Sequence, residues 1–323
     1  MADKNGLLLH VGLTKTATTT LQEALFAHHS QVFYCGKVKG LAHKGCVTEL
    51  LYEIFKPTLW QLRQPFDCAY PRNLYVEKVL PEISPEMVLV ASWESLGNRM
   101  TEKYVEMLKR LLQVFGGCRI LFVLRHPLSH IPSEYLQNLK GHFLRQNRPW
   151  MGSALFITIE EWFSRLRLNA GGEQNLFSYS ENIRASVNLL GQENVGVFLF
   201  EELLADPDNY YRSICEFIGI ETAEGVRLSR QQHFNRSLTQ EQFNRIREFN
   251  DSRWQRFYLK GKTFAGRNRL LGAQAGKSGD KPSAAKVELS DDLKAEIVAL
   301  SRSGHRWLSE NFNLPLAKYN YPL

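Results

Sequence analysis

A lysine followed by a run of threonines stands near the start of the chain, directly after a short apolar segment. The apolar segment is Leu7 to Val11, and Gly12 and Lys15 follow it. The five residues after Lys15 are Thr16, Ala17, Thr18, Thr19 and Thr20. Backbone N–H groups at a helix start, a nearby ammonium group and several hydroxyls together bind phosphate oxygens. One threonine would suffice to cap a helix, so the repetition favours a phosphate-binding loop over a simple polar turn.

An arginine and a serine at fixed spacing form the second candidate site. Arg125 leaves the apolar run Ile120 to Leu124, and Ser133 follows eight residues later within a helical pattern. The guanidinium group of arginine holds a phosphate through two parallel hydrogen bonds, and a serine one or two turns into the next helix adds its hydroxyl. An isolated Arg-x-Pro sequence would fit an arginine that only caps a turn. Two such motifs in order, each after an apolar run, favour a second phosphate contact.

The elements that must position these side chains alternate along the chain. Four apolar runs predict buried strands: Leu7 to Val11, Met87 to Ala91, Ile120 to Leu124 and Val195 to Phe200. Helices are expected at about Thr18 to His29, at Thr101 to Phe115, after Leu124 with Tyr135, Leu136 and Leu139 inward, from Pro207 to Gly219, and from about Ser290 to Asn311. This alternation predicts an α/β fold with a parallel sheet flanked by helices. Ligands in such sheets bind beyond the carboxyl ends of the strands.

Two stretches interrupt the alternation. Residues 33–85 contain many aromatic residues and scattered prolines, and we expect a helical excursion over the site. Its aromatic side chains form either the core of inserted helices or an acceptor pocket. Residues 226–282 are basic, with 13 Lys or Arg against four acids between Val226 and Lys281, and Gly261 to Pro282 has the composition of a flexible loop. We expect one domain spanning residues 1–323 that includes both stretches.

The lysine loop differs from the P-loop of kinases, which has the form GxxxxGK[ST]. Gly12 precedes Lys15 by only three positions, and Thr14 stands directly before the lysine. The loop resembles instead the 5′-phosphosulfate loop of the PAPS-dependent sulfotransferases, KTGTT or KSGTT after a strand, with Ala17 where glycine is usual. The Arg125 and Ser133 pair resembles the 3′-phosphate motif of that family. Weaker similarity continues through Val195 to Leu203, an Asp-Pro pair and Phe217 to Ile220, so the resemblance spans nearly the whole chain.

The resemblance implies a P-loop-containing sulfotransferase-like fold and a sulfuryl transfer from PAPS that leaves PAP. The acceptor would be a hydroxyl or an amine of a carbohydrate, a glycolipid or a small molecule. Lys15 would stabilise the charge that grows on the leaving oxygen. The residues that would bind the 5′ phosphate and the sulfonate are Lys15, Thr16, Ala17, Thr18, Thr19 and Thr20, and Arg125 with Ser133 would bind the 3′ phosphate. The basic segment would either close over the 3′ phosphate or receive an acidic acceptor, and no metal is required.

A general base is needed to accept the proton of the acceptor. Glu94 is our candidate, because it lies in the loop from Ala91 to Ser95 after the second strand, where carbohydrate-acting members of the resembled family often have glutamate. The alternative is a structural carboxylate that caps the next segment or pairs with a basic residue. His10 lies inside a strand and is interpreted as a core histidine, while His126 and His130 are secondary candidates beside the Arg125 motif.

Composition bounds the remaining function classes. The chain has 44% hydrophobic and 23% charged residues and a net charge of +7, and no apolar run approaches the length of about 20 residues that spans a membrane. Five scattered cysteines without a CxxC pair argue against a disulfide framework and a zinc site. We therefore expect a cytoplasmic enzyme without stable membrane insertion. The rivals are a small-molecule or nucleotide kinase, which needs a GK[ST] loop and acidic Mg²⁺ ligands, and a non-catalytic protein that binds a nucleotide or nucleic acid. No nucleic-acid module accompanies the charge, so no nucleic-acid partner is expected.

Overall fold

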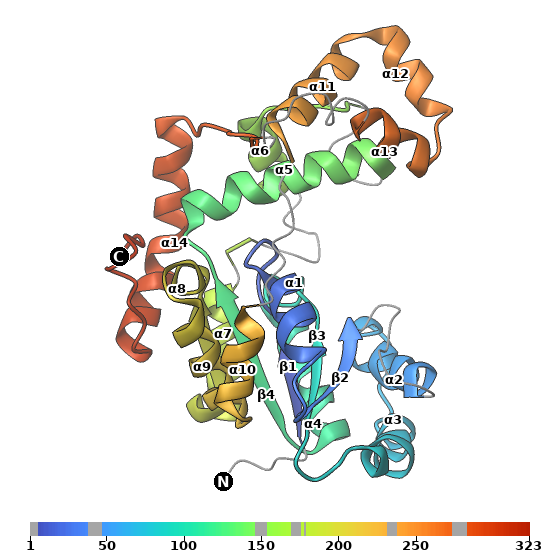
Figure 1. Ribbon diagram of the computed structural model, residues 1–323, viewed down its shortest axis with the longest axis vertical. Helices are drawn as coiled ribbons and strands as arrows, with labels where there is room; N and C mark the ends of the chain where they lie inside the picture. Colours follow the sequence, from blue (N-terminus) through green and yellow to red (C-terminus); the bar gives the residue numbers. More distant parts are fainter. Residues whose placement is uncertain are drawn as a thin grey trace. The chain divides into compact units, whose positions relative to one another are not determined.

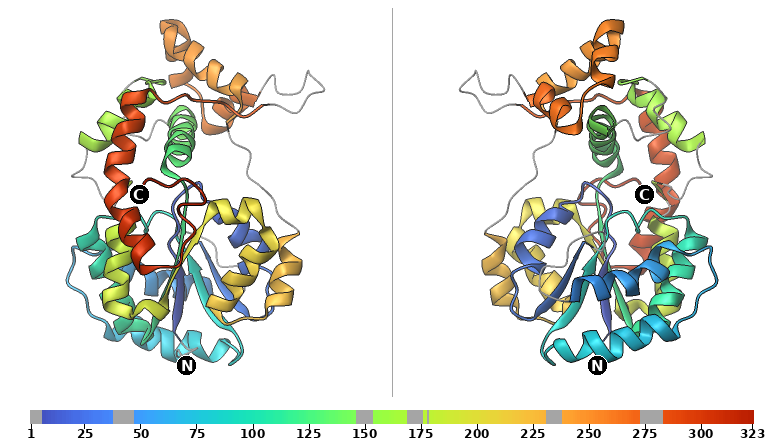
Figure 2. Two further views of the ribbon diagram at one scale, coloured as in Figure 1. Left: turned by 90° about the vertical axis from the view of Figure 1, so that its left-hand side faces the viewer. Right: turned by 90° about the vertical axis from the view of Figure 1, so that its right-hand side faces the viewer.

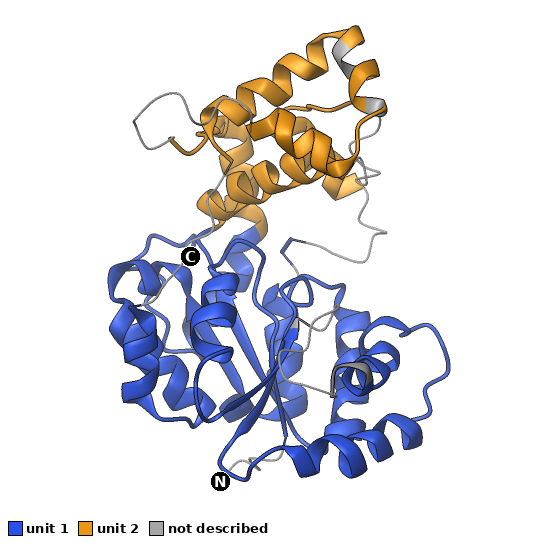
Figure 3. Cartoon of the chain, turned by 45° about the vertical axis from the view of Figure 1, so that its right-hand side comes forward, with its two compact units in different colours: residues 1–126, 173–234, 301–323 blue, residues 127–172, 235–300 orange. Residues whose placement is uncertain are grey.

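The computed structural model describes residues 6–37, 47–145, 154–168, 176–177, 179–230, 238–272 and 283–323. The chain divides into two compact units, each built from separate stretches of sequence (Figure 3). The first unit consists of residues 1–126, 173–234 and 301–323, and the second of residues 127–172 and 235–300. The first unit therefore contains Lys15, Glu94 and Arg125, and the second contains Ser133.

A parallel sheet forms the centre of the first unit (Figure 1). Its strands are β1 (Leu7–His10), β2 (Val32–Lys37), β3 (Val88–Ser92), β4 (Cys118–Leu124) and β5 (Val195–Leu199). The order across the sheet is β2–β3–β1–β4–β5, and all neighbours are parallel. β1 lies between β3 and β4, so the loops after these three strands share one edge of the sheet. The predicted α/β fold with a parallel sheet flanked by helices is confirmed.

Helices follow the strands of the first unit. They are α1 (Thr18–Thr20), η1 (Leu21–Phe26), α2 (Val47–Phe55), η2 (Lys56–Trp60), α3 (Ala69–Leu74), η3 (Tyr75–Val79), η4 (Leu80–Glu82), α4 (Thr101–Phe115), α7 (Tyr179–Leu190), η6 (Gln192–Asn194), α8 (Phe200–Ala205), α9 (Pro207–Ile218) and α10 (Thr222–Ser229). Two predicted helices are confirmed in detail. α4 ends at Gly116, whose φ of 76° is left-handed. Asp206 caps α9, because its carboxylate accepts the N–H of Asn209 at 3.0 Å.

Alternate side chains of the strands pack on opposite faces of the sheet. Leu7 and Leu9 of β1 belong to one hydrophobic core and Leu8 to the other. Residues of α4 and α7 complete the first core, and residues of η1, α9 and α10 complete the second (Figure 2). Burial on both faces explains why the strands read as continuous apolar runs in the sequence rather than as alternating patterns.

Two parts of the chain differ from the expected elements. The stretch 33–85 begins with strand β2 where helix was expected, because Val32, Phe33 and Tyr34 favour an extended edge strand beside β3. From Val47 to Glu82 helices make up its described part, apart from the loop at residues 61–68. In the basic stretch, α13 (Phe264–Gly272) occupies part of the expected loop, and residues 273–282 lie outside the described residues. The buried side chains of Arg267 and Leu271 hold α13 against its unit.

The second unit is helical in its described part. Its helices are α5 (Pro127–Arg145), α6 (Ile159–Leu168), α11 (Gln240–Asp251), α12 (Arg253–Lys260), α13 and α14 (Asp291–Asn311), whose last eleven residues from Ser301 belong to the first unit. Tyr135, Leu136 and Leu139 of α5 are buried, as predicted. The Tyr135 hydroxyl donates to the carbonyl oxygen of Ile157 at 2.6 Å, which holds the segment before α6 against α5.

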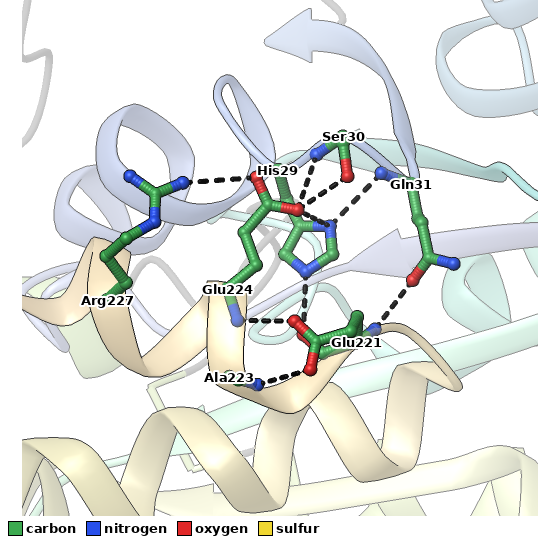
Figure 4. A network of polar contacts seen from close by, with 7 residues as sticks. All are labelled: His29, Ser30, Gln31, Glu221, Ala223, Glu224 and Arg227. Atoms are coloured by element: carbon green, nitrogen blue, oxygen red, sulfur yellow. Dashed lines mark hydrogen bonds and ion pairs between the residues drawn. The ribbon is translucent and has the colours of Figure 1, made fainter.

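A buried histidine ties the end of η1 to the start of α10 (Figure 4). Nε2 of His29 donates to the carbonyl oxygen of Glu221 at 2.8 Å, and Nδ1 accepts the backbone N–H of Gln31 at 3.2 Å. The Glu221 carboxylate in turn caps α10 by accepting the N–H groups of Ala223 and Glu224. We call these contacts the His29 clamp. The clamp fixes the far end of the helical segment that follows Lys15.

Candidate active site

The loop from Gly12 to Thr20, called the Lys15 loop below, connects β1 to α1. Two of its residues have left-handed backbones, Lys15 with a φ of 65° and Ala17 with a φ of 57°. The hydroxyl of Thr16 donates to the carbonyl oxygen of Leu13 at 2.6 Å, and the carbonyl oxygen of Ala17 accepts two backbone N–H groups of the following helical segment. These bonds turn the chain from strand into helix within a few residues. The left-handed backbone at position 17 is a conformation that glycine adopts without strain.

The threonines of the Lys15 loop divide into two sets. Thr16, Thr18 and Thr20 are buried, whereas Lys15 and Thr19 are half-buried. The buried set supports the turn from within, as the bond from Thr16 shows. With Thr14, which is also half-buried, Lys15 and Thr19 are the polar members of the loop whose side chains reach its surface.

Hydrogen bonds from the neighbouring loop hold the end of β1 in place. The backbone N–H of Trp93 donates to the carbonyl oxygen of His10 at 2.8 Å, and that of Gly97 donates to the carbonyl oxygen of Val11 at 3.0 Å. Gly12 has no room for a side chain, because an added Cβ would lie 2.8 Å from Nε2 of His10. The histidine ring therefore packs directly under the first residue of the Lys15 loop.

Four side chains link the end of β1 to the predicted base, and we call them the Glu94 chain. Nδ1 of His10 lies 2.8 Å from Oγ of Ser92. The amide of Gln22 donates to Oγ of Ser92 at 2.8 Å and to Oε1 of Glu94 at 3.1 Å. His10, Ser92 and Gln22 are buried, while Glu94 is half-buried. These contacts thus orient the half-buried carboxylate of Glu94 in the loop after β3, the strand that pairs with β1 and so lies beside the Lys15 loop.

Gln22 is a site residue that sequence reasoning missed. It lies in η1, a short π-helical segment, and π-helical turns occur often at functional sites. Its only signal in the sequence was its place two residues after the last threonine of the Lys15 loop. A second hydroxyl reaches the same cluster, since Tyr34 hydrogen-bonds Ser92, and burial raises the pKa of Tyr34 so that its phenol stays protonated.

Arg125 lies at the end of β4 and reaches back to the Lys15 loop. Its Nη1 donates to the carbonyl oxygen of Lys15 at 2.9 Å, and its guanidinium lies over the ring of Phe200 at 4.8 Å. Burial lowers the pKa of Arg125, while the nearby Glu201 and Tyr321 oppose that shift. An arginine so placed keeps its charge at neutral pH. The structure therefore brings Lys15 and Arg125 together at adjacent strand ends.

Glu201 fixes the turn after Arg125. Its Oε1 accepts the backbone N–H of His126 at 2.9 Å, and its Oε2 accepts the hydroxyl of Tyr321 at 2.8 Å. The sequence indicated only a weak family similarity for the segment that contains Glu201, and no role for that residue. The role could not be found there, because it depends on β5 pairing with β4.

The other predicted site residues are divided between the two units. Ser133 is half-buried on α5 and belongs to the second unit, as does His130, which is buried. His126 belongs to the first unit, where its Nε2 lies 2.9 Å from the carbonyl oxygen of Asn320. The binding of a 3′ phosphate by Ser133 stays a prediction.

The described aromatic side chains of the stretch 33–85 fall into two groups, and the acceptor pocket that the sequence suggested as an alternative to core packing stays a prediction. Phe55 and Tyr75 are buried against Phe115 of α4, with ring centroids 5.6 and 4.8 Å away. Trp60 instead packs on Trp93, the residue before Glu94, with centroids 4.6 Å apart. Both indoles are half-buried. The first group is core, and the tryptophan pair stands beside the predicted base.

Within the described ranges, the chain contains neither a metal-binding cluster nor a membrane-spanning helix. No cluster of three or more His, Cys, Asp or Glu side chains there could hold a metal ion. No helix among the described residues is long and apolar enough to cross a bilayer.

Comparison with known proteins finds one matching family and several similar solved structures. A model of the family described as "Sulfotransferase family" matches residues 8–224. A sulfotransferase from Alicyclobacillus acidocaldarius has a similar structure, with 14% identity and a TM-score of 0.51 over 99% of this chain and 98% of that one. Mouse sulfotransferase SULT7A1, solved in complex with PAP, has 14% identity and a TM-score of 0.50 over 98% and 89% of the two chains. These structural similarities show the fold. No curated protein matches the sequence.

Proposed function

Because this chain belongs to the sulfotransferase family, we propose that it transfers a sulfuryl group from PAPS to a hydroxyl or an amine and releases PAP. The observation that carries the proposal is the bond of 2.9 Å from Arg125 to the carbonyl oxygen of Lys15. It joins the two motifs that the sequence assigned to two phosphates. The PAP bound to the mouse structure of the same fold supports the same donor.

The Lys15 loop would hold the 5′ phosphate and the sulfonate. Its backbone N–H groups and the half-buried Thr19 supply hydrogen-bond donors at a helix start, where anions are favoured. Thr16 contributes through the backbone, because its hydroxyl is engaged with Leu13. Arg125, oriented by Lys15 and Phe200, would bind the 3′ phosphate, and Ser133 would add its hydroxyl.

The transfer breaks the bond between sulfur and the bridging phosphate oxygen and forms a bond between sulfur and the acceptor atom. Negative charge grows on the bridging oxygen as the first bond breaks, and the ammonium group of Lys15 stabilises it there. The acceptor loses its proton to the carboxylate of Glu94. Gln22 and Ser92 hold that carboxylate in place, so its orientation is set before the acceptor arrives.

We propose a carbohydrate or glycolipid as the acceptor, with a small natural product as the second choice. Glu94 supports this choice, as does the pair Trp60 and Trp93 beside it, since indole faces stack on sugar rings. We also propose that the chain acts as one sulfotransferase domain in the cytoplasm. The four described cysteines, which form no disulfide, agree with that location.

Calorimetric titration with PAP tests the donor site. We expect wild type to bind PAP, Lys15→Ala to bind it more weakly, and Arg125→Ala to lose about ten- to a hundredfold in affinity, because a charged hydrogen-bond pair is removed. Adenosine 5′-phosphate should bind wild type and Arg125→Ala with similar weak affinity, since it lacks the 3′ phosphate.

The matched control is Lys109→Ala, which removes an exposed cation from α4 and should leave PAP affinity unchanged. If PAP does not bind wild type while ATP with Mg²⁺ does, the donor assignment is wrong and the Lys15 loop belongs to a phosphotransferase.

A further inference from the structure

Three large aromatic side chains of α12 are exposed in the second unit, and a fourth is exposed at the start of α13. Trp254, Phe257 and Tyr258 of α12 are 85%, 74% and 51% exposed, and Phe264 at the start of α13 is 47% exposed. The spacing of the first three places them on one side of the helix. Other exposed large hydrophobic side chains of the described residues are scattered from Tyr52 to Leu323. A group of exposed aromatics on one element marks an interaction surface more often than single ones do.

This aromatic surface stands on a fixed support within its unit. The guanidinium of Arg267 is buried and donates to the carbonyl oxygens of Leu259 and Lys262, at the end of α12, and of Phe143 on α5. Leu259 itself is fully buried. The turn between α12 and α13 is therefore locked to α5, and the aromatic side is held outward.

The surface is also cationic. From Ser252 to Gly272 the sequence contains no acid and, besides the buried Arg267, five Lys or Arg: Arg253, Arg256, Lys260, Lys262 and Arg269. Among those with described side chains, Lys262 lies over the ring of Tyr258, with 4.3 Å between Nζ and the ring centroid. Arg145 of α5 lies over the ring of Phe264 at 4.9 Å. Aromatic rings and cations are thus interleaved, as in helices that lie at the interface of a bilayer.

We propose that this surface docks the protein onto an anionic lipid bilayer, with Trp254 and Phe257 in the interfacial layer. Charge complementarity selects this occupant. In a symmetric dimer the same surface would meet itself, and the cations of two copies would face each other. Anionic headgroups satisfy the cations, while the aromatic rings enter the boundary between headgroups and acyl chains. Docking of this kind is peripheral and needs no membrane-spanning helix.

Co-sedimentation of the full chain with vesicles tests the proposal. We expect binding to vesicles of phosphatidylcholine with phosphatidylglycerol, much weaker binding to phosphatidylcholine alone, and a loss of binding as salt is raised. The double variant Trp254→Ser and Phe257→Ser should lose at least about tenfold in vesicle affinity. Lys262→Glu should lose about tenfold, because one cation near the surface is replaced by an anion.

Matched variants separate docking from misfolding. Tyr70→Ser with Leu204→Ser removes two exposed hydrophobic side chains elsewhere, and Lys109→Glu reverses an exposed charge on α4; both should bind vesicles like wild type. The proposal is overturned if wild type does not bind the anionic vesicles or if the aromatic double variant binds them equally well. It is also overturned if light scattering shows a dimer that the double variant dissociates, or if that variant loses affinity for PAP, because the surface would then belong to a second copy or to the donor site.

Discussion

Two buried histidines stand at either end of the segment that follows β1, and they serve different purposes. His10 ends β1 and contacts Ser92, which leads through Gln22 to the half-buried Glu94. His29 follows η1 and contacts backbone groups, namely the carbonyl oxygen of Glu221 and the N–H of Gln31. The first set of contacts joins side chains and ends at a carboxylate near the Lys15 loop. The second joins backbone segments and ends in ion pairs at the surface, such as Arg227 with Glu224 at 3.3 Å.

The difference shows how a polar cluster that takes part in the reaction can be distinguished from one that stabilises the fold. Backbone partners are present whatever side chains a segment carries, so the His29 clamp ties elements together without presenting a reactive group. In the Glu94 chain, by contrast, three buried side chains orient one carboxylate. Substitutions in the two clusters should therefore change different quantities, turnover in one and unfolding free energy in the other.

Glu94→Gln should give the largest effect of the substitutions in the two clusters. The amide cannot accept the acceptor's proton, so we expect kcat to fall by about a factor of 10² to 10⁴. Affinity for PAP should stay that of wild type, because the proposed role of Glu94 is to accept the proton of the acceptor and not to bind the donor. The measurement is sulfate transfer from labelled PAPS under saturating conditions.

Glu102→Gln is the matched control for that experiment, since it neutralises an exposed carboxylate at the start of α4. Its turnover should equal that of wild type. If Glu94→Gln also keeps full turnover, Glu94 is a structural carboxylate and another group accepts the proton.

His29→Leu should show the opposite behaviour. The substitution leaves the Glu221 carbonyl and the Gln31 N–H without their buried partner, which costs about 1–3 kcal/mol of unfolding free energy. The kcat of the folded protein should not change. Urea unfolding measures the first quantity, and the exposed neighbour His28→Leu is the control that should leave it unaltered. A fall in kcat without a fall in stability would connect the clamp to the chemistry.

Gln22→Met tests whether Gln22 positions the base. Methionine keeps the length of the side chain and removes the amide that donates to Ser92 and Glu94. We expect kcat to fall about tenfold, the loss of roughly one hydrogen bond to a charged group, while KM for PAPS stays constant. Gln113→Met, on the exposed side of α4, should change neither value. If instead KM for PAPS rises and the free energy of unfolding falls while kcat is retained, Gln22 has only a packing role.

The sequence predicted the centre of the fold better than its margins, for physical reasons. Strands β1, β3, β4 and β5 are buried on both faces, so each is a continuous apolar run that can be recognised alone. β2 has a short apolar run, Val32 to Cys35, which Gly36 and Lys37 end, and it lies at the start of the aromatic-rich stretch that suggested helices. α11, α12 and α13 carry many cations, and composition alone did not reveal the buried positions Ile246, Leu259 and Leu271 that hold them in place.

The residues of the candidate site also differ in whether the sequence could predict them. Lys15, Glu94 and Arg125 could be chosen because each follows an apolar run, and parallel strands bring their carboxyl ends to one edge of the sheet. Gln22 and Glu201 could not, since their partners depend on which strands are neighbours: β1 beside β3 for Gln22, and β4 beside β5 for Glu201. Local sequence carries no information on that order.

Ala17→Gly should give the smallest effect, and it bears on the Lys15 loop itself. Alanine with a φ of 57° is strained by about 1 kcal/mol or more, and glycine removes that strain but gains freedom in the unfolded chain. The two effects oppose each other, and we expect a net stabilisation of roughly 0.5 kcal/mol with PAP affinity unchanged. Ala17→Val should instead destabilise the protein, because a β-branched residue tolerates the left-handed region least. Urea unfolding of both variants checks the sign of each change. If glycine destabilises and valine does not, the backbone at position 17 is not left-handed in solution, and the loop presents its N–H groups in another arrangement.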